Sequence, residues 1–235
     1  MIKYLIFDAG GVLVYPRLGQ WHIPYRAAQI LGRPRSDDLS TDAFARAMDA
    51  CMGWLGEDRI VADVETERWL RRGFVLELDR LMGWHMTDRE IADMTDDFTD
   101  DIDRYGFFDD LREYLSRWRE TYTLGLLSDA MPSVLVYLEQ SGLSDMFEQK
   151  VISTQVGAIK PSPRMYGEIL RRLGAAAGEC LFVDDRIGNV RGAVAMGMKA
   201  VQMSRPEFPA EELWDGPVVH SFQELDALLR EGAHA

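Results

Sequence analysis

A small set of polar side chains has the residue types needed for phosphoryl chemistry, and each follows a short apolar stretch of the chain. These side chains are Asp8, Ser128, Lys160 and the pair Asp184-Asp185. They supply a carboxylate nucleophile, a hydroxyl donor, a cation and two further carboxylates. Each alone is weak evidence, because a carboxylate or a serine after a strand is often only a helix cap. In combination they indicate one site.

The chemistry that this set favours is attack on a phosphoryl group. Its oxygens carry negative charge, so an anionic carboxylate such as Asp8 can attack only when cations and hydrogen-bond donors surround it. Lys160 would neutralise the phosphate and keep Asp8 ionised, and Ser128 would donate a hydrogen bond. Mg²⁺ prefers oxygen ligands, which Asp8, a backbone carbonyl and one of Asp184 and Asp185 could provide.

The apolar stretches predict the elements that position these residues. They are short and nearly continuous, which is typical of strands buried on both faces of a parallel sheet. Expected strands cover residues 2–7, 122–127, 149–153, 180–183, 200–203 and 218–219, and expected helices cover residues 109–118, 134–141, 164–173 and 188–196. This alternation predicts an α/β fold with a doubly wound parallel sheet, in which ligands bind beyond the carboxyl ends of the strands.

Residues 17–104 contain no buried-strand pattern and are expected to form a helical insertion. The core would then consist of residues 1–16 and 105–235. Helical spacing predicts helices at residues 25–31, 41–54, 63–81 and 87–103. The acidic cluster at residues 96–103 is expected to be a solvated helix face. The tryptophans and arginines of the insertion, Arg71 among them, do not single out any substrate contact, since most should pack or face solvent.

Composition excludes several functional classes. The formal net charge of −13 argues against nucleic acid as a partner, because phosphate backbones are held by a surplus of lysine and arginine. Asp8 interrupts the apolar N-terminus before a secretory signal or a membrane span could form. Cys51 and Cys180 form no C-x-x-C pattern and are expected to be buried and reduced. We therefore expect a cytoplasmic protein without membrane partners, either a monomer or a homodimer.

In their order along the chain, these motifs resemble the four motifs of the haloacid dehalogenase-like hydrolases. The resemblance rests on residues 7–13, 126–128, 157–161 and 182–198. It implies a Rossmann-like core with a helical type-one cap, Mg²⁺ as cofactor and a small phosphorylated molecule as substrate. It also assigns roles. Asp8 would be the nucleophile and a metal ligand, Gly10 would bind the metal through its carbonyl, and Asp185 would be the other metal ligand. Asp184 would support the metal ligands without contacting the metal, and Ser128, Asp129 and Lys160 would bind the phosphate.

Gly10 departs from the usual phosphatase pattern. Phosphatases of this family carry a second aspartate at that position, which protonates the leaving group, and such groups contribute roughly 10²- to 10⁴-fold in rate. We expect a phosphatase whose substrate has a labile or self-protonating leaving group, such as an acyl phosphate or a sugar 1-phosphate. The alternatives are a phosphate-binding or regulatory protein with little activity and, disfavoured by the Asp184-Asp185 pair, a 2-haloacid dehalogenase. A phosphonoacetaldehyde hydrolase would need a cap lysine, and residues 17–104 contain none.

Overall fold

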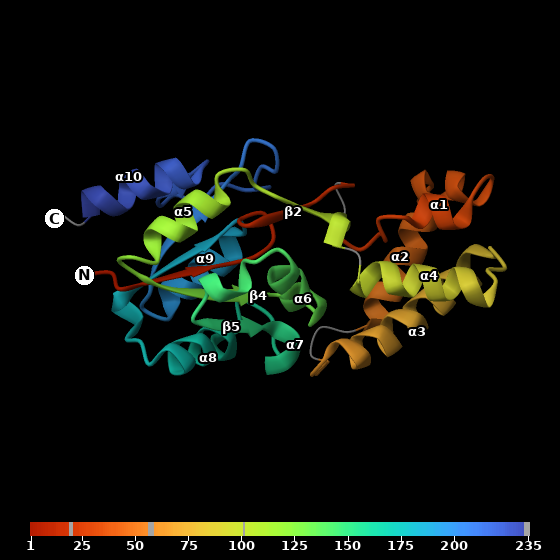
Figure 1. Ribbon diagram of the computed structural model, residues 1–235, viewed down its shortest axis with the longest axis horizontal. Helices are drawn as coiled ribbons and strands as arrows, with labels where there is room; N and C mark the ends of the chain where they lie inside the picture. The colour runs from red at the N-terminus through yellow and green to blue at the C-terminus, as the bar shows by residue number, and fades with distance from the viewer. Residues whose placement is uncertain (19–20, 56–58, 101, 233–235) are drawn as a thin grey trace.

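The computed structural model describes residues 1–18, 21–55, 59–100 and 102–232, and its centre is a six-stranded sheet (Figure 1). Each adjacent pair of strands is parallel. The spatial order is β5 (Gln149–Ile152), β4 (Thr123–Ser128), β1 (Tyr4–Phe7), β6 (Cys180–Asp184), β7 (Lys199–Met203) and β8 (Val218–Val219). The expected α/β fold is confirmed, because all six predicted strands form within two residues of their predicted ends.

Helices cover both faces of this sheet. Side chains alternate along a strand, so Leu5 and Phe7 lie in one apolar core and Ile6 lies in another. The first core includes α5 (Leu111–Trp118), α10 (Phe222–Gly232) and part of α6 (Ser133–Gln140), and the second includes α8 (Pro163–Leu173) and α9 (Ile187–Ala195). A short helix, α7 (Ser153–Val156), follows β5. The α10 helix was not predicted, although its apolar residues have helical spacing.

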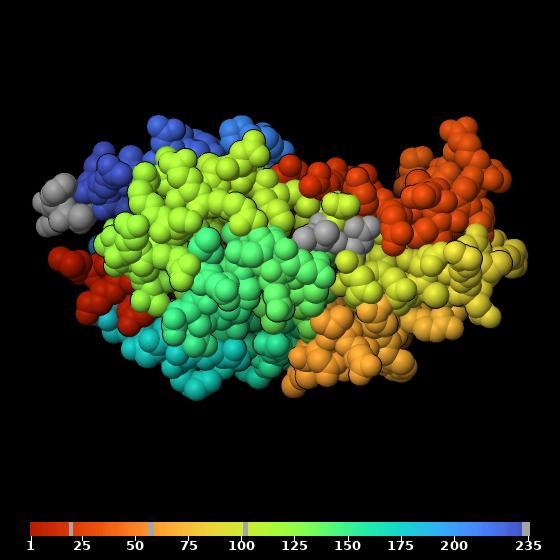
Figure 2. Space-filling view, viewed as in Figure 1, coloured from red at the N-terminus to blue at the C-terminus, as the bar shows by residue number. Residues whose placement is uncertain are grey.

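A separate helical part lies at one end of the molecule, away from both termini (Figures 1 and 2). It contains α1 (Ala27–Leu31), α2 (Asp42–Leu55), α3 (Val64–Met82) and α4 (Asp88–Thr99). These helices share an apolar core of their own, which is distinct from the two cores of the sheet. The α4 helix begins with a capping box, in which the Thr87 hydroxyl accepts from the Glu90 amide and the Glu90 carboxylate accepts from the Thr87 amide.

A small antiparallel pair of strands joins the helical part to the sheet. Here β2 (Val14–Pro16) pairs with β3 (Tyr105–Phe107), so the chain leaves and returns through adjacent strands. This pair was not predicted, because three-residue strands separated by about ninety residues leave no recognisable pattern. Short 3₁₀ helices occupy Arg35–Ser40, Ile102–Arg104, Ser144–Met146 and Ala177–Glu179.

The acidic cluster at the end of α4 is not a solvated face as a whole. Asp97 is 0% exposed, and it accepts hydrogen bonds from the amide and the Nε of Arg26. Asp96 and Asp100 pair with Arg68 on α3, and Asp101 lies outside the described residues. The expectation was therefore wrong for Asp97, because the charge pattern cannot show that arginines from two other segments pack against this helix.

Two smaller expectations concern the cysteines and membrane spans. Both cysteines are free and buried, as expected. None of the helices within the described ranges is long and apolar enough to cross a membrane.

Candidate active site

The register of the sheet brings Asp8 beside the Asp184-Asp185 pair. In β1, Phe7 is aligned with Val183 of β6, and the amide of Asp8 donates to the carbonyl of Val183 at 2.9 Å. Both strands run in the same direction, so the residues that follow them emerge at the same edge. The site therefore lies at the carboxyl edge of β1. The sheet continues from β1 to β4 on one side and to β6 on the other, so this edge is the switch point of a doubly wound sheet, where ligands bind.

Lys160 joins these carboxylates from the loop before α8. Its side chain is 0% exposed, and Nζ lies 2.9 Å from Asp8 Oδ1 and 2.6 Å from Asp184 Oδ2. Nζ also donates to the carbonyl of Leu127 at 3.1 Å, which ties the loop to β4. Burial alone would lower the pKa of Lys160, but the charges of Asp184 and Asp8 outweigh it and raise the pKa above its ordinary value. Lys160 is therefore a permanent cation.

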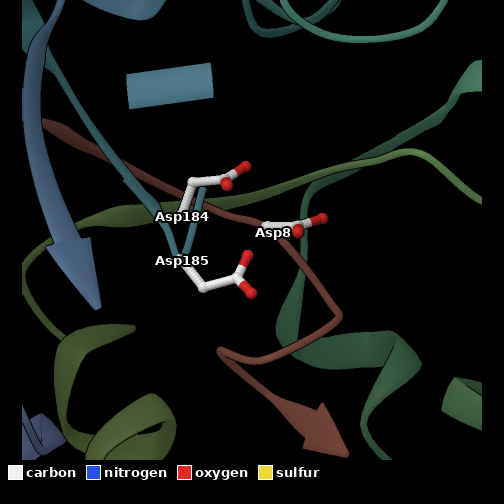
Figure 3. A group of neighbouring side chains, drawn as sticks. All are labelled: Asp8, Asp184 and Asp185. Atoms are coloured by element: carbon white, nitrogen blue, oxygen red, sulfur yellow. The ribbon is translucent and has the colours of Figure 1, made fainter. Parts of the chain in front are cut away.

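The two neighbouring aspartates have different surroundings (Figure 3). Asp184 is 0% exposed and accepts from Lys160, from the Arg186 amide at 2.8 Å and from Asn189 Nδ2 at 3.0 Å. Asp185 is partly exposed, and its carboxylate accepts no side-chain hydrogen bond among the described residues. Burial, followed by the charges of Asp8 and Asp184, raises the pKa of Asp185 to about 8. The oxygens of Asp184 are thus occupied, whereas those of Asp185 are available.

The acidic cluster fits a divalent cation. One oxygen from each of Asp8, Asp184 and Asp185 can be chosen so that all three lie within 4.8 Å of one another. Asp8 Oδ1 is buried and, apart from its ion pair with Lys160, accepts no hydrogen bond from the described residues. Three carboxylates beside one ammonium leave a net negative charge, and hard oxygen donors of this kind suit Mg²⁺.

The last residue of β4, Ser128, and the residue that follows it, Asp129, take different positions. Ser128 is the last residue of β4 and is 3% exposed, at the same edge as Asp8. The carboxylate of Asp129 accepts the Lys160 amide at 2.9 Å, so this side chain holds the lysine loop in place. Burial raises the pKa of Asp129 to about 6, although Lys160 opposes the shift. Because the Asp129 carboxylate is engaged with the Lys160 amide, Asp129 could bind phosphate only through its backbone N–H.

The turn after Asp8 depends on two glycines. A Cβ on Gly10 would lie 3.1 Å from the ring of Trp21, which covers the position of the usual second aspartate. Gly11 has a φ of 70°, and a Cβ there would lie 2.5 Å from Asp185 Oδ2. Both glycines therefore permit close contacts, and the contact with Trp21 is one that sequence reasoning missed. The one sign of this contact in the sequence was that Gly10 stands where the family usually has an aspartate.

Sequence comparison identifies the relatives of this chain. The family model of haloacid dehalogenase-like hydrolases matches residues 2–197. Over 92 residues the chain is 36% identical to a phosphatase of Mycobacterium tuberculosis, covering 39% of this chain and 40% of that protein. Over 68 residues it is 37% identical to a glyceraldehyde 3-phosphate phosphatase of Methanopyrus kandleri, covering 28% and 29%. These matches span less than half the length of the curated relatives.

Structural comparison supports the same fold. A haloacid dehalogenase-like (HAD) phosphatase from Thermococcus onnurineus has a TM-score of 0.64 at 21% identity, covering 97% of this chain and 98% of the other. An L-2-haloacid dehalogenase from Xanthobacter autotrophicus has a TM-score of 0.67 at 21% identity, covering 98% and 99%. One fold thus carries both activities, and the fold alone does not choose between them.

Proposed function

Because the chain belongs to the haloacid dehalogenase-like hydrolases, we propose that it is a Mg²⁺-dependent phosphatase that acts on a small phosphorylated metabolite. The observation that carries this proposal is the buried Lys160, which contacts Asp8 and Asp184 beside the free carboxylate of Asp185. Phosphatases among the partial relatives support the choice of reaction.

In this mechanism Asp8 is the nucleophile and forms an aspartyl-phosphate, which water then hydrolyses. Lys160, 2.9 Å from Asp8 Oδ1, neutralises the phosphate oxygens, and Ser128 and the Asp129 backbone donate hydrogen bonds to them. Asp8, Asp185 and the Gly10 carbonyl would hold Mg²⁺, which stabilises charge on the phosphoryl group when bound. Asp184 orients Lys160 through their 2.6 Å ion pair and would not contact the metal.

The acidic cluster is the main reason to prefer phosphate over a halogenated acid. Dehalogenation displaces a halide from carbon and needs no metal, so a crowded group of three carboxylates would only repel the acid substrate. Here Asp8, Asp184 and Asp185 leave a negative site that a bound cation would neutralise. A phosphate ester that arrives with Mg²⁺ fits this charge, whereas a bare haloacid does not.

Gly10 restricts the leaving groups that the enzyme can expel. With no carboxylic acid at this position and the Trp21 ring above it, the leaving oxygen must depart without a proton or carry its own. We therefore propose acyl phosphates or sugar 1-phosphates as substrates. Rates should fall steeply as the leaving group becomes more basic, more so than in an enzyme that has a general acid.

The helical part would act as the cap that closes over this site. We propose that it corresponds to residues 17–104, with the core formed by residues 1–16 and 105–235. The β2–β3 pair, through which the chain leaves and returns, is a suitable hinge because both crossings lie side by side. Substrate selection would then depend on residues that the cap brings towards Asp8.

The test is Mg²⁺-dependent hydrolysis of acetyl phosphate and p-nitrophenyl phosphate by the wild type and by Asp8→Asn. We expect activity that needs both the metal and Asp8, with little turnover of simple alkyl phosphates. A protein that binds phosphate with Mg²⁺ but hydrolyses neither compound would instead be a binding or regulatory protein, which the glycine at position 10 favours as the second candidate.

A further inference from the structure

Two buried arginines lie between the helical part and the core. Arg71 of α3 is 7% exposed, and Arg104, directly before β3, is 4% exposed. Both guanidinium groups contact the Phe98 ring, at 4.5 Å and 5.2 Å from its centroid. Glu67, 0% exposed, is the one carboxylate that pairs with either of them among the described residues. The cluster therefore carries a net positive charge, which is costly to bury unless an anion balances it.

The two arginines differ in how well their donors are used. Arg104 donates to the carbonyls of Phe98 and Trp21, each at 2.7 Å. The Arg71 Nε is buried and has no hydrogen-bond partner among the described residues, and it lies 3.5 Å from Glu67 Oε1 in an ion pair. Burial lowers the pKa of Arg71, and Glu67 opposes this shift. Arginine remains protonated nonetheless, so Arg71 is a buried cation whose Nε is not hydrogen-bonded among the described residues.

Glu67 is shared between Arg71 and Ser133. Oε2 accepts the amide of Ser133 at 2.7 Å, and Oε1 accepts the Ser133 hydroxyl at 2.9 Å. These bonds join α3 to the first residue of α6. The hydroxyl of Tyr137, one turn further along α6, is buried and has no hydrogen-bond partner among the described residues. The cluster thus contains a guanidinium N–H and a phenol that have no hydrogen-bond partner among the described residues, and both are donors that an anion could use.

A solvent-exposed side chain lies within the field of this cluster. His22 is exposed, yet its pKa is lowered to about 4, first by desolvation and then by the charges of Arg71 and Arg104. His22 is therefore neutral at neutral pH and adds no charge of its own.

The cluster is connected to the proposed active site through Trp21. The Trp21 carbonyl accepts from Arg104, and its ring covers Gly10, two residues after Asp8. We propose that Arg71, supported by Arg104 and Tyr137, binds a second anionic group of the substrate, either a carboxylate or another phosphate. This rests on the proposed function, because the first anionic group would be the phosphate held at Asp8. The substrate class becomes phosphorylated acids or bisphosphates.

The test uses ligands that cannot be hydrolysed, so binding is measured without turnover. Alkylphosphonates, ω-phosphonocarboxylates and α,ω-bisphosphonates of increasing chain length are titrated into the full-length protein with Mg²⁺ by calorimetry. We expect the second anion to tighten binding roughly tenfold to a hundredfold at one chain length, as for hydrogen bonds to charged groups. The series that shows the gain identifies carboxylate or phosphate as the group.

Arg71→Met should remove this gain, which is measured for each variant relative to that variant's own alkylphosphonate binding. Arg72→Met is the matched control, because Arg72 is the adjacent residue but is exposed, and it should keep the gain. Arg71→Lys retains the positive charge and covers the case in which the methionine variant does not fold; it should reduce the gain, since lysine cannot form the paired hydrogen bonds of a guanidinium.

Three results would overturn the inference. The second anion gives no gain at any length, the gain survives in both Arg71 variants, or Arg72→Met abolishes it equally. If a gain that depends on Arg71 appears while acetyl phosphate and p-nitrophenyl phosphate are not hydrolysed, the anion site stands and the proposed catalysis fails. If hydrolysis occurs without the gain, catalysis stands and the anion site fails. If alkylphosphonates, ω-phosphonocarboxylates and bisphosphonates all fail to bind, both the proposed phosphatase site and the anion site are contradicted.

Discussion

Replacing Lys160 by methionine should destabilise the fold strongly, and by an amount that depends on pH. The substitution leaves Asp8 and Asp184, which are 7% and 0% exposed, facing each other without the ammonium that contacts both. Breaking a buried ion pair by removing one partner costs about 3–5 kcal/mol. At neutral pH in a metal chelator, we expect a loss of that size in the free energy of unfolding.

The pH dependence follows from Asp184. Burial already raises its pKa above the ordinary 3.8, and removal of Lys160 raises it further. A carboxyl group whose pKa is higher in the folded state binds protons preferentially when folded, so the folded state gains stability as the pH falls towards the unfolded value. The deficit of Lys160→Met should therefore shrink between neutral pH and about pH 5. Adding Mg²⁺ at neutral pH should also reduce it.

Urea unfolding of the wild type, Lys160→Met and Lys199→Met measures this effect. Lys199 is exposed at the start of β7, so its loss removes the same charge without uncovering buried carboxylates. It should cost less than about 1 kcal/mol. The reasoning is refuted if the two variants lose equal stability, or if acid enlarges the deficit of Lys160→Met.

Three further predictions concern the metal site and the α4 cap. Gly11→Ala should weaken Mg²⁺ binding at least about tenfold, because the new Cβ would displace Asp185. Gly32→Ala is the control: Gly32 also has a positive φ, of 62°, but nothing lies within 4 Å of a Cβ there. Gly32→Ala should therefore cause only the backbone strain of about 1–2 kcal/mol and leave Mg²⁺ binding unchanged. Because the pKa of Asp185 is raised to about 8, Mg²⁺ affinity measured by calorimetry should increase about tenfold per pH unit from about pH 6 to 8 and then level off. Glu90→Gln should cost up to about 1 kcal/mol in thermal unfolding, because glutamine keeps the capping position of α4 but loses the ion pair with Arg35. The pKa of Glu90 is lowered to about 2, so this stability is present above about pH 4.5 and is lost as the pH falls towards 2.

Each of these has a result that contradicts it. Equal Mg²⁺ affinity in the two alanine variants would mean that the close contact of Gly11 is relieved without moving the metal ligand. Affinity independent of pH would mean that Asp185 is not a ligand. For Glu90→Gln, a deficit that persists unchanged in acid would place its origin in helix propensity and not in the charge.

The parts of the site that the sequence predicted are those fixed by strand order. Asp8, Ser128 and Asp184 each stand at the end of a parallel strand, and β4, β1 and β6 are adjacent, so their ends converge. Lys160 could be singled out because the chain has only four lysines. These predictions depended on local pattern and on the rules of parallel sheets, which do not require knowledge of side-chain packing.

What the sequence could not predict is which charged residues are buried by distant segments. Arg71 and Arg72 are adjacent and identical in type, yet one is 7% exposed and the other faces solvent. The difference depends on the phase of α3 against Phe98 and α6, which no single-sequence pattern contains. Asp97 was misinterpreted for the same reason. Trp21 covers Gly10 while its ring packs on Tyr105 of β3 and on Phe208, which are distant in the sequence.

The two charge clusters are linked through one stretch of chain. Ser128 ends β4, and five residues later Ser133 begins α6 and donates two hydrogen bonds to Glu67 of α3. A movement of the helical part that shifts Glu67 would therefore act on the loop that carries the proposed phosphate donors. An anion that neutralises Arg71 would act on the same carboxylate, since Arg71 is the ion-pair partner of Glu67.

This link bears on the order of binding. At the metal site, negative charge exceeds positive charge, and the opposite holds at the arginine cluster. A ligand that brings Mg²⁺ and phosphate to one cluster and a second anion to the other would relieve both imbalances at once. Phosphate alone would relieve only the first. The second anion should therefore improve metal binding as well as its own, because two ligands coupled through one equilibrium assist each other equally.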